Sequence, residues 1–179
     1  MKPPNTDGAD AFRRFASGAT TQLGRLAYLL CGDRHLAEDL VQSCLIKMYL
    51  AWPRLTEPDA ALGYARRVLL RCWLNEARRP WRRSEARDGV VPDVPDGTAD
   101  PALDAGAGHV RAVLLGALGQ LPPRQRAAVV LRYWVQLSVA ETAAAMRCSE
   151  GTVKSQSARG LATLRAALSG TDQITELSQ

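Results

Sequence analysis

Several residue patterns that define common protein classes are missing from this chain of 179 residues. It holds only four cysteines and two histidines, and no two cysteines form a CxxC pair. These absences exclude the usual zinc sites and a disulfide framework. No apolar run has the length of a membrane span, and residues 1–7 lack the apolar core of a signal peptide. We therefore expect a cytoplasmic protein without membrane contact, metal or cofactor, whose cysteines are small buried side chains.

Catalytic signatures are absent as well. The sequence has no glycine-rich phosphate loop, no HExxH pair and no nucleophile beside a recognisable base. Two histidines and scattered carboxylates on predicted helices do not make an active site. The sequence thus predicts no catalytic residue and a protein that is not an enzyme.

Charge is distributed unevenly along the chain, whose net charge is +5. Residues 1–83 hold 14 basic and 8 acidic side chains, residues 84–109 hold 1 and 6, and residues 110–179 hold 8 and 4. Two basic segments therefore flank an acidic one. Clustered basic charge favours nucleic acid as a partner more than the modest net charge does.

Helical periodicity marks two separate segments. In the first, apolar residues recur every three or four positions and predict helices divided near Asp33 and stopped by Pro53 and Pro80. The stripes are Leu23, Leu26, Ala27 and Leu30, and then Ala37, Leu40, Val41, Cys44 and Met48. Residues 84–109 show no apolar period and contain several prolines and glycines. The predicted fold is all-α: two small helical domains, 10–83 and 110–168, joined by a flexible acidic linker, 84–109, that lets each domain reach its own site.

The second domain contains a predicted helix-turn-helix. Ser138 followed by Glu141 is a capping box, and Ser149 is a candidate N-cap for the next helix. The turn between the helices usually needs a residue with positive φ, and here that position falls to Arg147. Such a motif lays its second helix in a DNA major groove. The residues expected to contact DNA are Ser149, Thr152, Lys154, Ser155 and Arg159.

A second candidate DNA site lies on the third helix of the first domain, about residues 60–79. Arginines alternate there with aromatic residues, a composition that suits single-stranded DNA because cations follow the backbone while rings stack on bases. An alternative for the aromatic residues, Tyr64 and Trp73 among them, is that they anchor the core. The candidate contacts are Arg66, Arg67, Arg71, Trp73, Arg78, Arg79 and Arg82.

The second helix carries a polar edge around Asp39 and Gln42 that nothing local explains. This edge is either plain solvent-exposed surface or a face on which another protein docks. The sequence leaves both interpretations open.

Taken together, these segments resemble the extracytoplasmic-function sigma factors of bacterial RNA polymerase, in particular an actinobacterial subgroup. The resemblance covers about residues 12–168. It is carried by residues 26–33 with 37–42, by residues 64–83, and by residues 121–126 with the helix-turn-helix. The order and spacing of the three segments make it specific.

The resemblance implies a subunit that directs promoter-specific transcription initiation. The first domain would bind the clamp helices of core RNA polymerase through Asp39 and Gln42, and would capture unpaired −10 bases. The linker would mimic nucleic acid inside the polymerase. The second domain would place Lys154, Ser155 and Arg159 in the −35 element of promoter DNA and touch the polymerase flap. The family also makes an anti-sigma factor an expected partner.

Two other functions compete with this one. A dimeric helix-turn-helix regulator would need a dimer seam or a ligand pocket in the first domain, and the sequence indicates neither. A pure protein-interaction module would have no use for the helix-turn-helix or for the arginines at 78–83.

Overall fold

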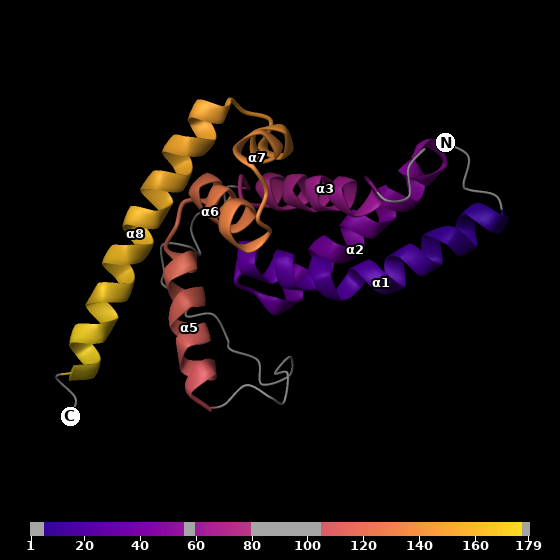
Figure 1. Ribbon diagram of the computed structural model, residues 1–179. Coiled ribbons are helices and arrows are strands. Elements are labelled where there is room, and N and C mark those ends of the chain that lie inside the picture. Colours follow the sequence, from indigo (N-terminus) through magenta and orange to yellow (C-terminus); the bar gives the residue numbers. More distant parts are fainter. Residues whose placement is uncertain (1–5, 56–59, 80–104, 177–179) are drawn as a thin grey trace.

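The computed structural model describes residues 6–55, 60–79 and 105–176, and these form helices with no strand among them. Figure 1 shows the helices in two groups that lie against each other. The N-terminal unit comprises α1 (Thr6–Cys31), α2 (Arg34–Ala51), the short helix η1 (Trp52–Arg54) and α3 (Ala61–Glu76). The C-terminal unit comprises α5 (Ala105–Gly119), α6 (Pro123–Val129), the π-helical turn η3 (Val130–Trp134), α7 (Val139–Met146) and α8 (Glu150–Glu176). The all-α prediction is confirmed.

The N-terminal unit buries the two predicted apolar stripes. Each of the nine residues named from periodicity is 6% exposed or less, so the inner faces of α1 and α2 are as predicted. Asp33 caps α2, because its Oδ1 accepts a hydrogen bond from the backbone N–H of Leu36 at 2.7 Å. Gly32, with φ 74°, makes the reversal between the two helices.

The helix-turn-helix forms with its predicted local signals. Ser138 Oγ accepts from the N–H of Glu141 at 3.1 Å, and Glu141 Oε2 accepts from the N–H of Ser138 at 2.7 Å, which completes the capping box. Arg147 ends α7 in the left-handed region at φ 51°. Ser149 Oγ then accepts from the N–H of Thr152 at 3.1 Å and caps α8.

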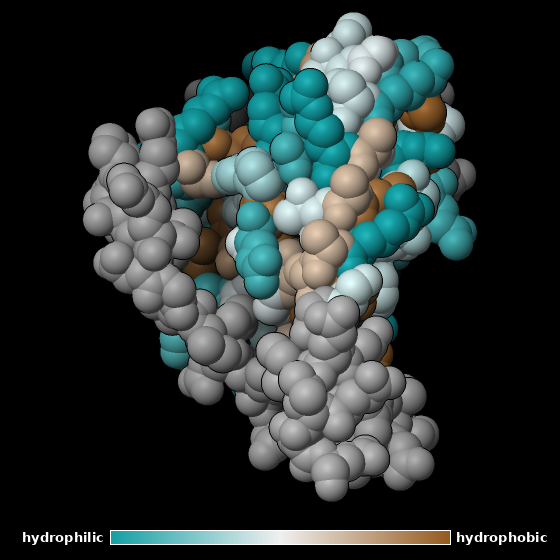
Figure 2. Space-filling model, turned by 90° about the vertical axis from the view of Figure 1, so that its left-hand side faces the viewer, coloured by the Kyte–Doolittle hydropathy of each residue, from teal (hydrophilic) through white to brown (hydrophobic). Residues whose placement is uncertain are grey.

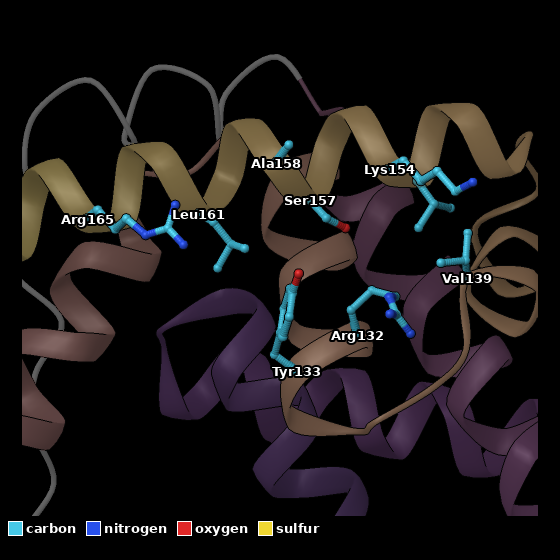
Figure 3. Close-up of a pocket in the computed structure, with 9 residues that line it drawn as sticks. Arg132, Tyr133, Val139, Lys154, Ser157, Ala158, Leu161 and Arg165 are labelled. Carbon is cyan, nitrogen blue, oxygen red and sulfur yellow. The ribbon is translucent and has the colours of Figure 1, made fainter.

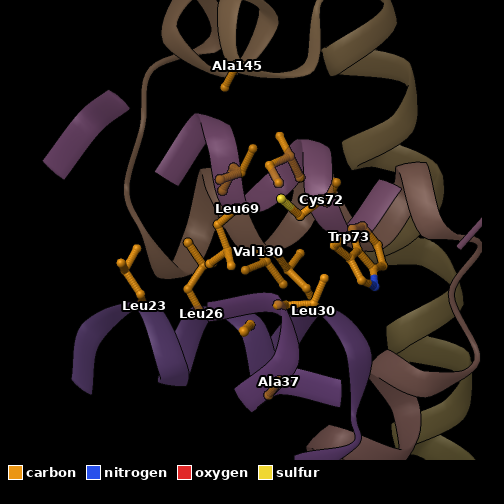
Figure 4. Packing of buried hydrophobic residues seen from close by; sticks show 14 of the residues in the cluster. Leu23, Leu26, Leu30, Ala37, Leu69, Cys72, Trp73, Val130 and Ala145 are labelled. Atoms are coloured by element: carbon orange, nitrogen blue, oxygen red, sulfur yellow. The ribbon is translucent and has the colours of Figure 1, made fainter. Parts of the chain in front are cut away.

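The two units share one hydrophobic core, which the sequence did not predict. The buried cluster runs from Leu26 and Leu30 in α1 through Leu69 in α3 to Val130 and Ala145 of the C-terminal unit. Figure 4 shows the α1 leucines and Leu69 converging on Val130, with Ala145 pointing toward α3. In this structure the apolar surface that each unit leaves open is covered by the other.

The predicted boundaries differ from the helix limits in two places. Helix α5 begins at Ala105, inside the segment 84–109 assigned to the linker, and α8 continues to Glu176, past the predicted limit of 168. Residues 84–104 of the predicted linker lie outside the described residues. None of the helices described here is long and apolar enough to cross a bilayer.

Candidate nucleic-acid interface

Helix α8 presents a polar face to solvent along its first half. Lys154, Ser155 and Arg159 are exposed, Ser149 is exposed just before the helix, and Thr152 is half-buried at its first turn. The opposite side is packed, with Val153 fully buried and Ser157 6% exposed. Figure 2 views the molecule from the α8 side, where hydrophilic side chains dominate and apolar patches lie recessed between them. The five residues predicted to contact DNA therefore share one accessible surface.

Gly160 allows α8 to pack closely on α6. A Cβ placed on it would lie 2.7 Å from Val129 Cγ2 and 3.3 Å from the carbonyl oxygen of Gln125. Both contacts are shorter than ordinary van der Waals packing, and one is to backbone that cannot rotate away. The orientation of the exposed face of α8 relative to the rest of the unit thus depends on a residue without a side chain.

Gly160→Ala is expected to lower the free energy of unfolding by about 1–3 kcal/mol, because the added methyl group overpacks this contact. Gly24→Ala is the matched control: a Cβ placed at Gly24 would have no atom within 4 Å, so α1 should gain about 0.5–1 kcal/mol from the better helix former. Urea unfolding of both variants measures whether the free energy of unfolding falls for Gly160→Ala and rises for Gly24→Ala. Adding Val129→Ala should restore part of the loss at Gly160, and no restoration would contradict the proposed clash.

A groove beside α8 brings Lys154 together with two arginines, Arg132 and Arg165, that the sequence analysis did not name. It lies between η3 and α8, and Arg132, Lys154 and Arg165 stand among its lining residues. Figure 3 shows the Ser157 hydroxyl and the Tyr133 ring pointing into it. Ser157 Oγ is buried and has no hydrogen-bond partner among the described residues. Arg132 lies in the π-helical turn that precedes the helix-turn-helix, and the fold places it beside α8.

The arginine-rich helix α3 has a mixed surface. Arg66, Arg67 and Arg71 are half-buried, whereas Arg78 and Arg79, just beyond the helix, are exposed. The Arg67 guanidinium lies 5.8 Å from the centre of the Tyr64 ring, and Arg79 pairs with Glu76 at 3.3 Å. The predicted contact Arg82 lies outside the described residues.

Trp73 is not available for base stacking in this structure, which corrects its assignment as a −10 contact. Its side chain is 3% exposed and belongs to the shared core. Figure 4 shows it on α3 with its ring inside the packed region. Helical position decides this outcome: Trp73 lies four residues after Leu69, on the buried side of the helix. The alternative interpretation of a core anchor is the one that fits.

The exposed edge of α2 is more apolar than the sequence analysis indicated. Asp39 and Gln42 are exposed, and Ile46 and Leu50 follow on the same side of the helix with 62% and 37% of their surface exposed. Two aliphatic side chains that follow two exposed polar residues along one helix edge make this edge a candidate for a protein contact, although their exposure alone does not establish one. The sequence did hold a signal, because Ile46 falls outside the buried stripe that includes Cys44 and Met48.

The helix-turn-helix and the basic helices define the class of a DNA-binding transcription factor. Comparison with known proteins shows the family within this class. Residues 20–83 match the family model "Sigma-70 region 2" and residues 111–164 match "Sigma-70, region 4". The chain is 36% identical over 161 residues to the RNA polymerase sigma-E factor of Streptomyces avermitilis, covering 90% of this chain and 87% of that one. It is also 36% identical over 142 residues to the ECF RNA polymerase sigma factor SigE of Mycolicibacterium smegmatis, covering 79% and 55%.

Among solved structures, the sigma factor RpoE of Bartonella quintana, in complex with the anti-sigma factor NepR, matches with a TM-score of 0.68 and 25% identity. The match covers 88% of this chain and 96% of RpoE, and thus both units. The chain therefore belongs to the extracytoplasmic-function sigma factors, which direct transcription initiation by RNA polymerase.

Proposed function

We propose that α8 reads the −35 element of the promoter, with Lys154, Ser155 and Arg159 reaching base edges and phosphates. Ser149 and Thr152 at the helix start would hold a phosphate. The observation that carries this proposal is the continuous exposed face that these residues form on the second helix of a helix-turn-helix. Arg132 and Arg165, in the groove beside the same helix, would extend the path of the DNA backbone.

The remaining contacts divide among the other helices. Arg66, Arg67, Arg71, Arg78 and Arg79 on and after α3 would contact the −10 element, and Asp39 and Gln42 on α2 would contact the clamp helices of core polymerase. The C-terminal unit would touch the flap. The chain would have no catalytic activity of its own and would act in the cytoplasm, where its polymerase and DNA are.

An anti-sigma factor is a further proposed partner, because the structurally similar RpoE was solved in complex with one. The competing function, a dimeric regulator, would require binding to duplex DNA without polymerase.

In vitro transcription tests the proposed function. Core RNA polymerase is incubated with fragmented genomic DNA of the source organism, with and without the chain, and transcript starts are mapped. New starts that share two motifs at fixed spacing support the proposal. Tight binding to duplex DNA without new starts would favour the dimeric regulator.

The docking face on α2 gives a separate prediction. Ile46→Asp is expected to weaken binding to core polymerase by at least tenfold, because an apolar contact would be replaced by a charge that must be desolvated. Stability should change little, since Ile46 is 62% exposed. Arg54→Asp, at an exposed position of η1, is a control that lowers the net charge of the same unit by two, compared with one for Ile46→Asp. Fluorescence anisotropy with labelled chain measures both. Equal affinities of the two variants for core polymerase would show that Ile46 does not contact it.

A further inference from the structure

A cluster of one amine and two thiols lies between α2 and α3. Lys47 Nζ, from α2, donates a hydrogen bond to Cys72 Sγ on α3 at 3.2 Å. Cys44 Sγ, one helical turn before Lys47, donates to the carbonyl oxygen of Ala65 on α3 at 3.3 Å. Both hydrogen bonds cross from one helix to the other, and none of the proposed DNA or polymerase contacts uses these three side chains.

The thiol of Cys44 is chemically quiet. Its side chain is fully buried, and this burial raises its pKa to about 12, with a further contribution from Cys72 that Lys47 partly offsets. Cys44 therefore keeps its proton at neutral pH and shares it with the Ala65 carbonyl. Since the thiolate is the form of cysteine that reacts with oxidants, Cys44 is a poor site for oxidation.

Cys72 has a different environment. Its sulfur accepts a hydrogen bond from an ammonium group, and a cation beside sulfur is a setting that favours the reactive thiolate. Cys72 is 7% exposed whereas Cys44 is 0% exposed, and Lys47 belongs to the exposed surface of α2. Among the ion pairs in the described part of the chain, none involves Lys47. The amine is thus held against the more accessible of the two sulfurs.

We propose that Cys72 and Lys47 form a peroxide-responsive modification site, at which oxidation joins the two side chains and links α2 covalently to α3. Hydrogen peroxide oxidises the Cys72 thiol to a sulfenic acid and is itself reduced, which releases one water. Lys47 Nζ gives up a proton to solvent and attacks this sulfur. The S–O bond breaks, an S–N bond forms, and the hydroxyl group leaves as a second water.

The link is reversible and restrains the N-terminal unit. An added dithiol such as dithiothreitol attacks the sulfur, returns the Cys72 thiol and the Lys47 amine, and is itself oxidised to a disulfide. While the link is present, it closes the chain between residues 47 and 72 and so restricts the unfolded state. The unit that holds the proposed polymerase contacts thus becomes more resistant to unfolding under oxidising conditions.

Mass spectrometry of the full chain tests the site after treatment with hydrogen peroxide. The intact mass should fall by two hydrogen atoms. Trypsin normally cuts after Lys47, but the link blocks this cut and joins residues 35–54 to residues 72–78. A disulfide between Cys44 and Cys72 has the same intact mass but leaves Lys47 open to trypsin, so it joins residues 35–47 to residues 72–78.

Two variants and one matched control assign the atoms. Lys47→Arg keeps the charge but offers no nucleophilic amine, so Cys72 should remain a sulfenic acid that dimedone labels. Cys72→Ser should give neither the link nor a label at position 72. Cys148→Ser removes a half-buried cysteine of the other unit and should leave the link unchanged. Far-UV circular dichroism checks folding, and Lys47→Arg decides alone if Cys72→Ser loses helix.

Thermal unfolding gives a second measurement. The peroxide-treated Cys148→Ser chain should unfold several degrees above its reduced form, and dithiothreitol should reverse this rise. A Cys72 thiol that stays unmodified while Cys148 of the wild type is oxidised would overturn the proposal. A disulfide between Cys44 and Cys72 in place of the link to Lys47 would overturn it as well.

The modification site does not depend on the proposed function, and the two can fail separately. If the reduced chain directs new transcript starts but peroxide forms no link, only the modification site is wrong. If peroxide forms the link but the reduced chain directs no starts, the promoter assignment fails while the modification site stands.

Discussion

Trp73→Ala is expected to lower the free energy of unfolding by about 3–5 kcal/mol, the largest stability effect of any substitution considered for this protein. The indole is 3% exposed and belongs to the core that both units share. Its removal leaves a cavity among neighbours on several helices, which cannot all move to fill it. Small domains have a free energy of unfolding of only about 5–15 kcal/mol. A loss of this size therefore removes a large part of the stability of the N-terminal unit.

Trp134→Ala is the matched control for Trp73→Ala. Trp134 is 59% exposed at the end of η3, so the same change should alter stability by less than about 0.5 kcal/mol. Thermal and urea unfolding measure both variants. If Trp73→Ala instead kept full stability and lost only promoter opening, its ring would face DNA in the working complex and the core assignment would be wrong.

The double variant Lys154→Ala with Arg159→Ala should reduce affinity for the −35 duplex on the order of a hundredfold or more. Each bidentate base contact contributes about 1–3 kcal/mol to discrimination, and two residues on one helix face add their losses when they contact different bases. Both side chains are exposed, so the fold should be unaffected. The target is the −35 motif obtained from the mapped transcript starts, measured by anisotropy at fixed salt.

Arg111→Ala is the control for charge in that experiment. Arg111 is exposed on α5 in the same unit, and its loss should weaken binding only through the small change in net charge. The single variants Lys154→Ala and Arg159→Ala then show whether each residue contacts a base or a phosphate. A residue that reads a base loses discrimination against altered sequences, whereas a phosphate contact loses affinity for all sequences alike and lowers the salt dependence. Unchanged affinity of the double variant for the −35 duplex would show that this face of α8 does not contact the −35 bases.

The local organisation of the protein was predictable because its signals act over a few residues. The apolar stripes of α1 and α2 follow from helical periodicity, and the residues they named are buried. The Ser138 capping box joins positions three residues apart, and Arg147 had to accept a positive φ because no glycine is present in the turn. The exposed face of α8 likewise follows from the period of a single helix.

Long-range packing decided the rest. The composition of α3 allowed Trp73 to face either DNA or the core, and the choice depends on which elements cover that side of the helix. Arg132 precedes the helix-turn-helix in the sequence, and its place in the groove beside α8 depends on how these segments pack together.

The sequence by itself determined two helical units, their caps and the face of α8 that meets solvent, because periodicity and capping depend on residues close in the chain. Only the tertiary structure decided that these units share a core, with Arg126 linking the ends of α1 and α5. Leu30 and Arg126 are 96 positions apart. Contacts over such distances depend on how whole surfaces complement each other, and no local pattern in the sequence encodes that fit.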